Sequence, residues 1–140
     1  AHAVFDELVV AVARNVAKQG TFSVEERIEM LRSAVGHLPG IRITAFDGLL
    51  VDYVTRREAQ VIVRGLRAVS DFEVEFQMAL MNRRLDPAVD TVFMMPAEQY
   101  TYISSRLIKE VFSLGGRVSG LVPESVERRL RDKQGARRSP

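Results

Sequence analysis

Residues 61–85, VIVRGLRAVSDFEVEFQMALMNRRL, decide how the rest of the chain is interpreted. An apolar run at 61–63 ends in the segment RGLR at 64–67, and a helical pattern follows from Asp71 to Leu85. In open α/β sheets, ligands bind at the carboxyl ends of parallel strands, and guanidinium groups bind phosphate oxygens two at a time. We therefore expect Arg64 and Arg67 to form a phosphate-binding site beside Gly65. The alternative is a solvated turn in which the two arginines pair with Asp71 or Glu73.

Four apolar segments predict parallel strands: 8–13, 41–45, 60–63 and 91–95. Helical patterns alternate with them. They cover the segment that begins at the capping-box pair Ser23 and Glu26, then 49–57 and 71–85, a helix from Ser104-Ser105 to Leu114, and a last helix that begins near Pro123. This alternation predicts a single-domain α/β fold with a doubly wound, Rossmann-like parallel sheet.

The helix predicted over 71–85 carries two apolar stripes at 100° per residue. Phe72, Phe76, Ala79 and Leu80 form one stripe, and Val74, Met78, Met81 and Leu85 form the other. One stripe can face the sheet, and in a chain this short the second is expected to face another copy. Glu75 and Asn82 share the polar strip between the stripes.

Composition narrows the class of protein. The 140 residues are 46% hydrophobic and 27% charged, which suits one globular domain. No cysteine is present and no apolar run approaches the roughly 18 residues of a membrane helix, so we expect a cytoplasmic protein without membrane contact. Residues 124–140 hold six basic and three acidic side chains, and the rest is nearly neutral. Nucleic-acid binding is therefore not expected, and 134–140 is expected to be a flexible basic tail.

Other polar residues are weaker candidates. Lys18 follows the first strand on the same sheet edge as Arg64, although a single lysine in a loop is usually a solvent-exposed residue without a specific role. Ser104-Ser105 open a helix whose N–H groups suit a phosphate, or they simply cap it. Glu75 is either a ribose or metal contact or a solvated glutamate, and Tyr100 and Tyr102 either stack on a base or pack in the core.

Several enzyme classes lack support in the sequence. Neither a G-x-G-x-x-G segment nor a Walker lysine loop occurs, which argues against dehydrogenases and P-loop enzymes. No nucleophile stands with a base, and His2 and His37 lack partners at metal-ligand spacing, so no protein metal site is expected.

Five segments in order resemble the phosphopantetheine adenylyltransferase family of bacterial coenzyme A biosynthesis: VVAVARNVAKQGTFSVEER, FDGLLVDY, VIVRGLRAVSDFEVEFQMALMNRRL, TVFMMP and YTYISSRLIKEV. The resemblance implies a nucleotidyltransferase domain over 1–133. It also implies transfer of AMP from ATP to 4′-phosphopantetheine, with Mg²⁺ present, in a homohexamer.

The resemblance also implies the roles of individual residues. Lys18 and Arg64 match positions that hold the phosphate of phosphopantetheine, and Leu50 matches one along its arm. Lys18 and Arg67 are the expected charge stabilisers. The positions matching ATP contacts are Gly65, Leu66, Arg67, Glu75, Tyr100, Thr101, Tyr102, Ile103, Ser104, Ser105 and Arg106. Arg106 stands where the family often has a third serine.

The family also has a first strand and a T/H-x-G-H signature ahead of the segment that matches Ala1 onward. That strand forms the middle of the family's sheet, so we expect the domain as given to lack its central strand and the catalytic histidine to lie upstream of Ala1. Two alternatives remain at this stage: a pyridine-mononucleotide adenylyltransferase, and a non-catalytic oligomeric nucleotide-binding protein.

Overall fold

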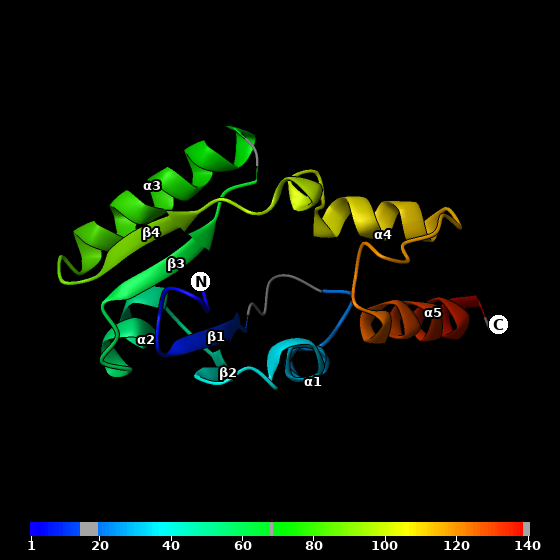
Figure 1. Cartoon of the computed structure of the whole chain (residues 1–140), viewed down its shortest axis with the longest axis horizontal. Helices are drawn as coiled ribbons and strands as arrows, with labels where there is room; N and C mark the ends of the chain where they lie inside the picture. Colours follow the sequence, from blue (N-terminus) through cyan, green and yellow to red (C-terminus); the bar gives the residue numbers. More distant parts are fainter. Residues whose placement is uncertain (15–19, 68, 139–140) are drawn as a thin grey trace.

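The computed structural model of the chain describes residues 1–14, 20–67 and 69–138. Within them the fold consists of two β-α-β units followed by two helices (Figure 1). The first unit contains β1 (Leu8–Ala13), α1 (Val24–Val35) and β2 (Ile41–Phe46). The strands β1 and β2 are parallel, with Leu8 opposite Ile41 and Ala13 opposite Phe46. A helix between two parallel strands is the expected crossover connection.

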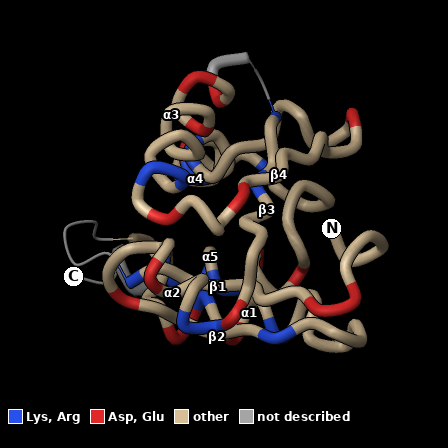
Figure 2. Tube along the Cα trace, turned by 90° about the vertical axis from the view of Figure 1, so that its left-hand side faces the viewer, with Lys and Arg blue, Asp and Glu red and all other residues tan. Residues whose placement is uncertain are grey.

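The second unit repeats this arrangement. It contains β3 (Val61–Gly65), α3 (Val69–Leu85) and β4 (Asp90–Met94), and β3 and β4 are parallel. The short helix α2 (Leu50–Arg56) joins the two units. Figure 2, turned by 90°, shows β3, β4 and α3 in one half of the molecule and β1, β2 and α1 in the other. The predicted α/β class and the parallel pairing are therefore confirmed.

The doubly wound sheet that the sequence predicts is divided in two within the described residues. They form two separate sheets of two strands, β1 with β2 and β3 with β4. The strands β1 and β3 both line a cavity of about 710 Å³, so the backbones of these two strands do not pair across it. The observed break lies where the family's central strand was expected, between the two inner strands.

The C-terminal part adds a 3-10 turn η1 (Glu98–Tyr100), α4 (Ser105–Ser113) and α5 (Glu124–Arg138). The helix α5 continues through residues 134–138, where we expected a flexible tail to begin. Its sequence is rich in arginine and glutamate, which are good helix formers, and only Gly135 interrupts it. Ion pairs from Arg129 to Glu29 and from Lys133 to Glu26 hold α5 against α1.

Two small apolar cores hold these parts together. Val54, Ile62 and Val89 form one core, between α2 and the second unit. Ile108, Val118 and Leu130 form the other, between α4 and α5, and Val118 is fully buried there. The second core fixes the start of α4 relative to α5, and both helices contribute to the cavity described below.

Local sequence signals set the ends of α1. Ser23 accepts a hydrogen bond from the Glu26 N–H, and the Glu26 carboxylate accepts one from the Ser23 N–H. This reciprocal arrangement is the predicted capping box. After the helix, Gly40 adopts a φ of +72°, and a Cβ at this position would collide with the carbonyl oxygen of Asp6. Glycine is therefore required for the chain to turn into β2.

The helix α3 differs from the expectation that one of its stripes is buried. Phe72, Phe76 and Leu80, from the stripe expected to face the sheet, are each about half exposed, as are Val74, Met78, Met81 and Leu85 from the other stripe. A sheet of two strands is too narrow to cover a helix of 17 residues. Phe72 and Phe76 stack on each other instead, with ring centroids 5.6 Å apart. Both stripes of α3 thus remain available for contact.

Across the described ranges, we find no helix with both the length and the apolar character that a membrane span requires.

Candidate functional site

Arg64 lies at the carboxyl end of β3 and forms a two-point ion pair with Glu75 of α3. Its Nε and one terminal nitrogen donate to the two carboxylate oxygens at 2.7 and 2.5 Å. The Arg64 side chain is 47% exposed and that of Glu75 is 18% exposed. The hydrogen bonds to Glu75 raise the pKa of the Arg64 guanidinium, an effect that partial burial opposes. Glu75 thus holds the cation in place and would compete with a phosphate for it.

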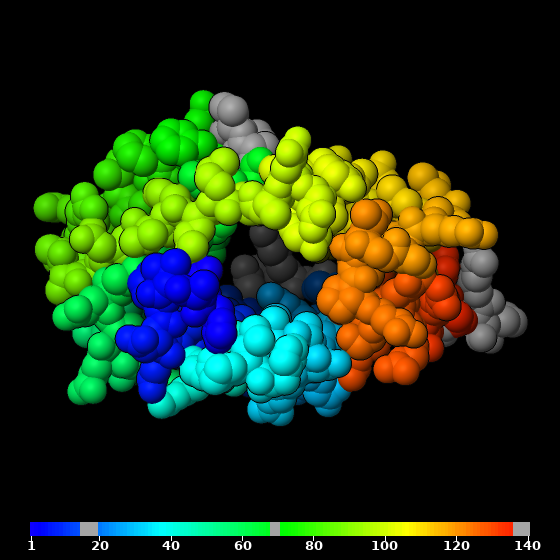
Figure 3. Space-filling view, in the orientation of Figure 1, coloured from blue at the N-terminus to red at the C-terminus, as the bar shows by residue number. Residues whose placement is uncertain are grey.

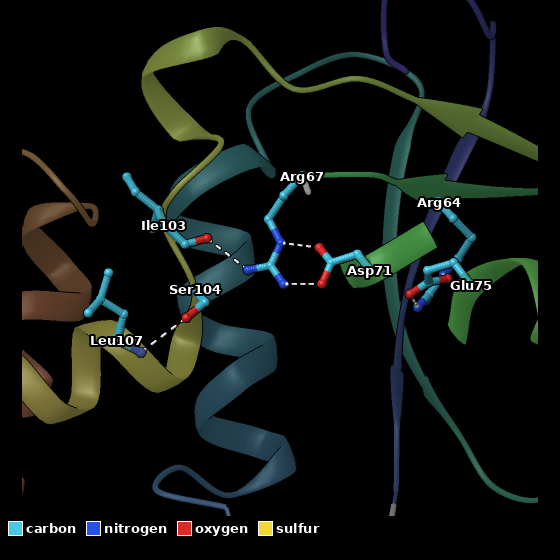
Figure 4. A network of polar contacts seen from close by, with 7 residues as sticks. All are labelled: Arg64, Arg67, Asp71, Glu75, Ile103, Ser104 and Leu107. Carbon is cyan, nitrogen blue, oxygen red and sulfur yellow. Dashed lines mark hydrogen bonds and ion pairs between the residues drawn. The ribbon is translucent and has the colours of Figure 1, made fainter. Parts of the chain in front are cut away.

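Arg67 connects β3 to the loop before α4. Its guanidinium donates to both carboxylate oxygens of Asp71, at 2.9 and 3.3 Å, and to the carbonyl oxygen of Ile103 at 2.8 Å. Figure 4 shows Arg67 directed toward Ile103, whereas Arg64 is directed toward Glu75. The alternative pairing of Arg67 with Asp71 is therefore confirmed, while Arg64 pairs with Glu75 and not with Asp71 or Glu73.

The backbone between the two arginines supports this arrangement. Gly65 is the last residue of β3, and the Leu66 N–H donates to the carbonyl oxygen of Met94 at 3.0 Å. This bond continues the β3–β4 pairing by one residue and fixes the direction in which Arg67 leaves the strand. A Cβ at Gly65 would meet no atom closer than 4.0 Å, so packing alone does not explain this glycine.

The segment 100–106 leads into α4. Ser104 is the N-cap, and its hydroxyl accepts a hydrogen bond from the Leu107 N–H at 3.1 Å. The capping interpretation of Ser104 is therefore confirmed. Thr101 donates to the Glu98 carbonyl oxygen, while Tyr100 and Tyr102 are 48% and 61% exposed. Both rings are thus free to contact a ligand and are not core residues. Arg106 is exposed on the first turn of α4.

Two cavities receive the candidate residues. The cavity between β1 and β3 is lined by Leu50 and Arg64, the two described residues that the resemblance assigns to phosphopantetheine. A second cavity, of about 860 Å³, is lined by Ile103, Ser104 and Ser105 from the ATP set. Figure 3 shows a hollow at the centre of the molecule, bordered by the N-terminal residues, α1 and the segment leading into α4.

The two cavities meet at the end of β1, because Ala13 lines both of them. The candidate residues are therefore divided between two cavities, with Arg64 in one and Ser104 and Ser105 in the other. Arg67 lines neither cavity but bonds to Ile103, which lines the second.

Lys18 lies outside the described residues, so its position relative to Arg64 stays a prediction. Among the residues that the structure describes, no group of three or more His, Asp or Glu side chains is placed to hold a metal ion.

Sequence reasoning missed the other walls of the second cavity. Arg27 and Met30 of α1, Lys109 of α4 and Val126 and Leu130 of α5 also line it. One signal was available: Arg27 and Lys109 each lie four residues after a serine at a helix opening, Ser23 and Ser105, and therefore share a face with it.

Comparison with known proteins assigns the chain. A family model described as cytidylyltransferase-like matches residues 1–111. The phosphopantetheine adenylyltransferase of Heliobacterium modesticaldum is 52% identical over 132 residues, which cover 94% of this chain and 79% of that protein. Those of Syntrophus aciditrophicus and Cupriavidus taiwanensis are 53% and 55% identical, over 92% and 93% of this chain and 78% and 81% of their own lengths.

The chain belongs to the phosphopantetheine adenylyltransferase family. This family lies within the broader cytidylyltransferase-like group, and membership in it confirms the resemblance seen in the sequence. Membership also favours an enzyme over the non-catalytic nucleotide-binding protein and over the pyridine-mononucleotide enzyme. The geometry agrees with the family in one respect: Leu50 and Arg64, matched to phosphopantetheine, line one cavity, and three of the residues matched to ATP, Ile103, Ser104 and Ser105, line another that shares Ala13 with it.

Proposed function

We propose that the chain transfers the adenylyl group of ATP to the phosphate of 4′-phosphopantetheine, giving dephospho-coenzyme A and pyrophosphate in coenzyme A biosynthesis. The observation that carries the proposal is identity above 50% with phosphopantetheine adenylyltransferases across more than 90% of the chain. The two adjoining cavities support it, because a two-substrate reaction needs both ligands bound side by side.

The chemistry requires little beyond placement and neutralisation of charge. An oxygen of the phosphopantetheine phosphate attacks the α-phosphorus of ATP and forms a new phosphoanhydride bond. The bond from that phosphorus to the oxygen bridging to the β-phosphate breaks, and its electron pair leaves with pyrophosphate. Because the substrate supplies the nucleophile, the protein does not need one.

Each described candidate residue then has a role. Arg64, with Leu50 on the same cavity wall, binds the phosphopantetheine phosphate, for which Glu75 gives up its place on the guanidinium. Arg67 stabilises the charge that develops near the opening of α4. Ser104 and Ser105 contact the phosphates of ATP, and the exposed rings of Tyr100 and Tyr102 contact its base. The resemblance assigns Lys18 to the phosphate of phosphopantetheine as well.

The central test replaces Arg64 in the full-length protein. Losing a charge-assisted hydrogen bond costs about 1.5–3 kcal/mol, so Arg64→Ala should raise the KM for phosphopantetheine by roughly 10- to 100-fold. The KM for ATP should change much less. Steady-state kinetics of pyrophosphate release measure both constants, with nicotinamide mononucleotide as a substrate that should not react.

Arg83→Ala provides a matched control. Arg83 is also an exposed arginine with a carboxylate partner, Asp90 at 2.5 Å, but it lines neither cavity. Its replacement should leave both KM values unchanged. Equal effects of the two substitutions, or none from Arg64→Ala, would contradict the role assigned to Arg64.

The proposal includes Mg²⁺, carried on the phosphates of ATP. Magnesium is often bound through substrate phosphates and water instead of a cage of protein ligands. This mode fits the described residues, which offer no cluster of acidic or histidine ligands. When bound, the ion would neutralise charge on the triphosphate. Chelation should abolish activity, and restoration by Mg²⁺ with no metal retained by the dialysed protein would support this mode.

We also propose that the protein is a cytoplasmic homohexamer in which α3 lies at a subunit contact. The half-exposed stripe of Val74, Met78, Met81 and Leu85 supports such a contact. Light scattering should give six times the chain mass, and Met81→Lys should reduce it. A wild-type monomer at micromolar concentration would contradict the assembly.

A further inference from the structure

The second cavity has an unusual charge composition. Its lining residues come from the end of β1, from α1, α4 and α5 and from the segments that precede these helices, and they include Arg27 and Lys109 but no aspartate or glutamate. The apolar part of the wall comes from residues such as Val126 and Leu130 of α5. A concave surface with two cations and no acid favours an anionic ligand at the position of the cations.

Arg27 of α1 is free because the acids of that helix form ion pairs with other cations. Glu25 pairs with Arg14, Glu26 with Lys133 and Glu29 with Arg129, at 3.1, 2.8 and 2.5 Å. Within the described part of the chain, Arg27 has neither an ion pair nor a side-chain hydrogen bond. Its charge is therefore available to the cavity.

Lys109 on α4 also lacks an acidic partner. No carboxylate among the described residues lies within ion-pair distance of its ammonium group, and the side chain lines the second cavity. Lys109 lies four residues after Ser105, about 6 Å further along α4 at 1.5 Å per residue. It therefore extends the phosphate-binding side of the cavity by about one helical turn beyond the serines.

The groups along the second cavity lie in an order that matches the successive phosphates of ATP. Ala13 marks the junction with the cavity of Arg64, where the attacking phosphate binds, and Ser104 and Ser105 line the second cavity with it. Lys109 lies beyond the serines on the same helix. A nucleotide whose α-phosphorus lies at the junction would direct its β- and γ-phosphates into the cavity that contains the two free cations.

We propose that Arg27 and Lys109 bind the terminal phosphates of ATP and hold the pyrophosphate product after the α–β phosphoanhydride bond breaks. This inference rests on the proposed adenylyl transfer and adds two residues that contact the phosphates of the substrate and product. The negative charge on the leaving pyrophosphate increases as that bond breaks, and two cations without competing acids stabilise it more strongly than the intact triphosphate.

The test measures inorganic pyrophosphate directly. Calorimetric titration of the full-length protein with pyrophosphate should show about 10-fold weaker binding for Arg27→Gln and for Lys109→Gln, corresponding to the loss of one charge-assisted hydrogen bond each. The KM for pyrophosphate in the reverse reaction should rise by a similar factor, while the KM for phosphopantetheine should stay unchanged. Arg27→Lys, which retains the charge, should recover most of the affinity.

Arg32→Gln is the control for loss of net charge. Arg32 is exposed on the same helix and has no ion pair with an acid among the described residues, but it does not line the cavity. Equal weakening by Arg32→Gln, or unchanged pyrophosphate binding in both cavity variants, would overturn the proposal. Absence of adenylyl transfer by the wild-type protein would instead overturn the proposed function, because pyrophosphate binding is measured without turnover.

Discussion

The structure contains two groups of cations that differ in their surroundings. At the end of β3, Arg64 and Arg67 are paired with Glu75 and Asp71 of α3. In the second cavity, Arg27 and Lys109 have no acidic partner among the described residues, because the acids of α1 bind other cations. The paired arginines are held in defined positions and must exchange a carboxylate for a phosphate. The unpaired cations attract an anion without such an exchange.

The largest effect is expected at Arg67, which belongs to the paired group but has a second task. Arg67→Ala removes the bonds to both Asp71 and the Ile103 carbonyl, and so detaches the start of α3 from the loop before α4. We expect kcat/KM to fall by about 100-fold or more, equivalent to about 3 kcal/mol of transition-state stabilisation. Steady-state kinetics with both substrates test this. Activity equal to that of Arg83→Ala would mean that the β3 end is only structural.

A smaller effect with a distinctive sign is expected from Glu75→Gln. The substitution removes the carboxylate that occupies Arg64, so the phosphopantetheine phosphate no longer has to displace it. We expect the KM for phosphopantetheine to fall a few-fold while the KM for ATP rises, since charge-assisted bonds are about twice as strong as neutral ones. A rise in both constants would show that Glu75 mainly orients Arg64 and does not compete for it.

The smallest effect is expected on stability, from an acid of α1 that pairs with a cation other than Arg27. The hydrogen bond from Lys133, followed by that from the Ser23 backbone, lowers the pKa of Glu26. A carboxyl whose pKa is lower in the folded state stabilises the protein above its unfolded pKa, and this contribution is lost as the pH falls through the folded value. Glu26→Gln should therefore cost about 0.5–1 kcal/mol near pH 7 and almost nothing in acid.

Denaturant unfolding at neutral and acidic pH measures this difference. Glu29→Gln is the control, because Glu29 pairs with Arg129 but takes no part in the capping box. It should cost less at neutral pH. A cost of Glu26→Gln that is the same at both pH values would show that its carboxylate charge contributes nothing.

Much of the fold was predictable because it depends on local signals. The strand over Leu8–Ala13 was predicted with the observed limits, since its continuous apolar run has no competing pattern. The start of α1 followed from Ser23 and Glu26, whose reciprocal bonds involve only four consecutive residues. The α/β class followed from the alternation of such segments, each recognisable by itself.

The parts that could not be predicted depend on contacts between distant segments. Arg64 pairs with Glu75, 11 residues away, and this partner depends on how α3 lies on β3. Phe72 and Phe76 have the helical spacing of core residues but stay half exposed, because the two-stranded sheet beneath them is narrow. The walls of the second cavity come from three helices that are distant from one another in the sequence. They were therefore not predicted, even though two cations in these walls follow helix openings.

The side chain of Ala13 is a single methyl group at the place where the two cavities meet. This residue ends β1 and lines both cavities, so a change of its side chain alters the walls of both proposed binding sites at once. A branched side chain there would add bulk to the part of the wall that the two cavities share. We expect such a variant to bind each substrate alone and to hinder the approach of one substrate to the other.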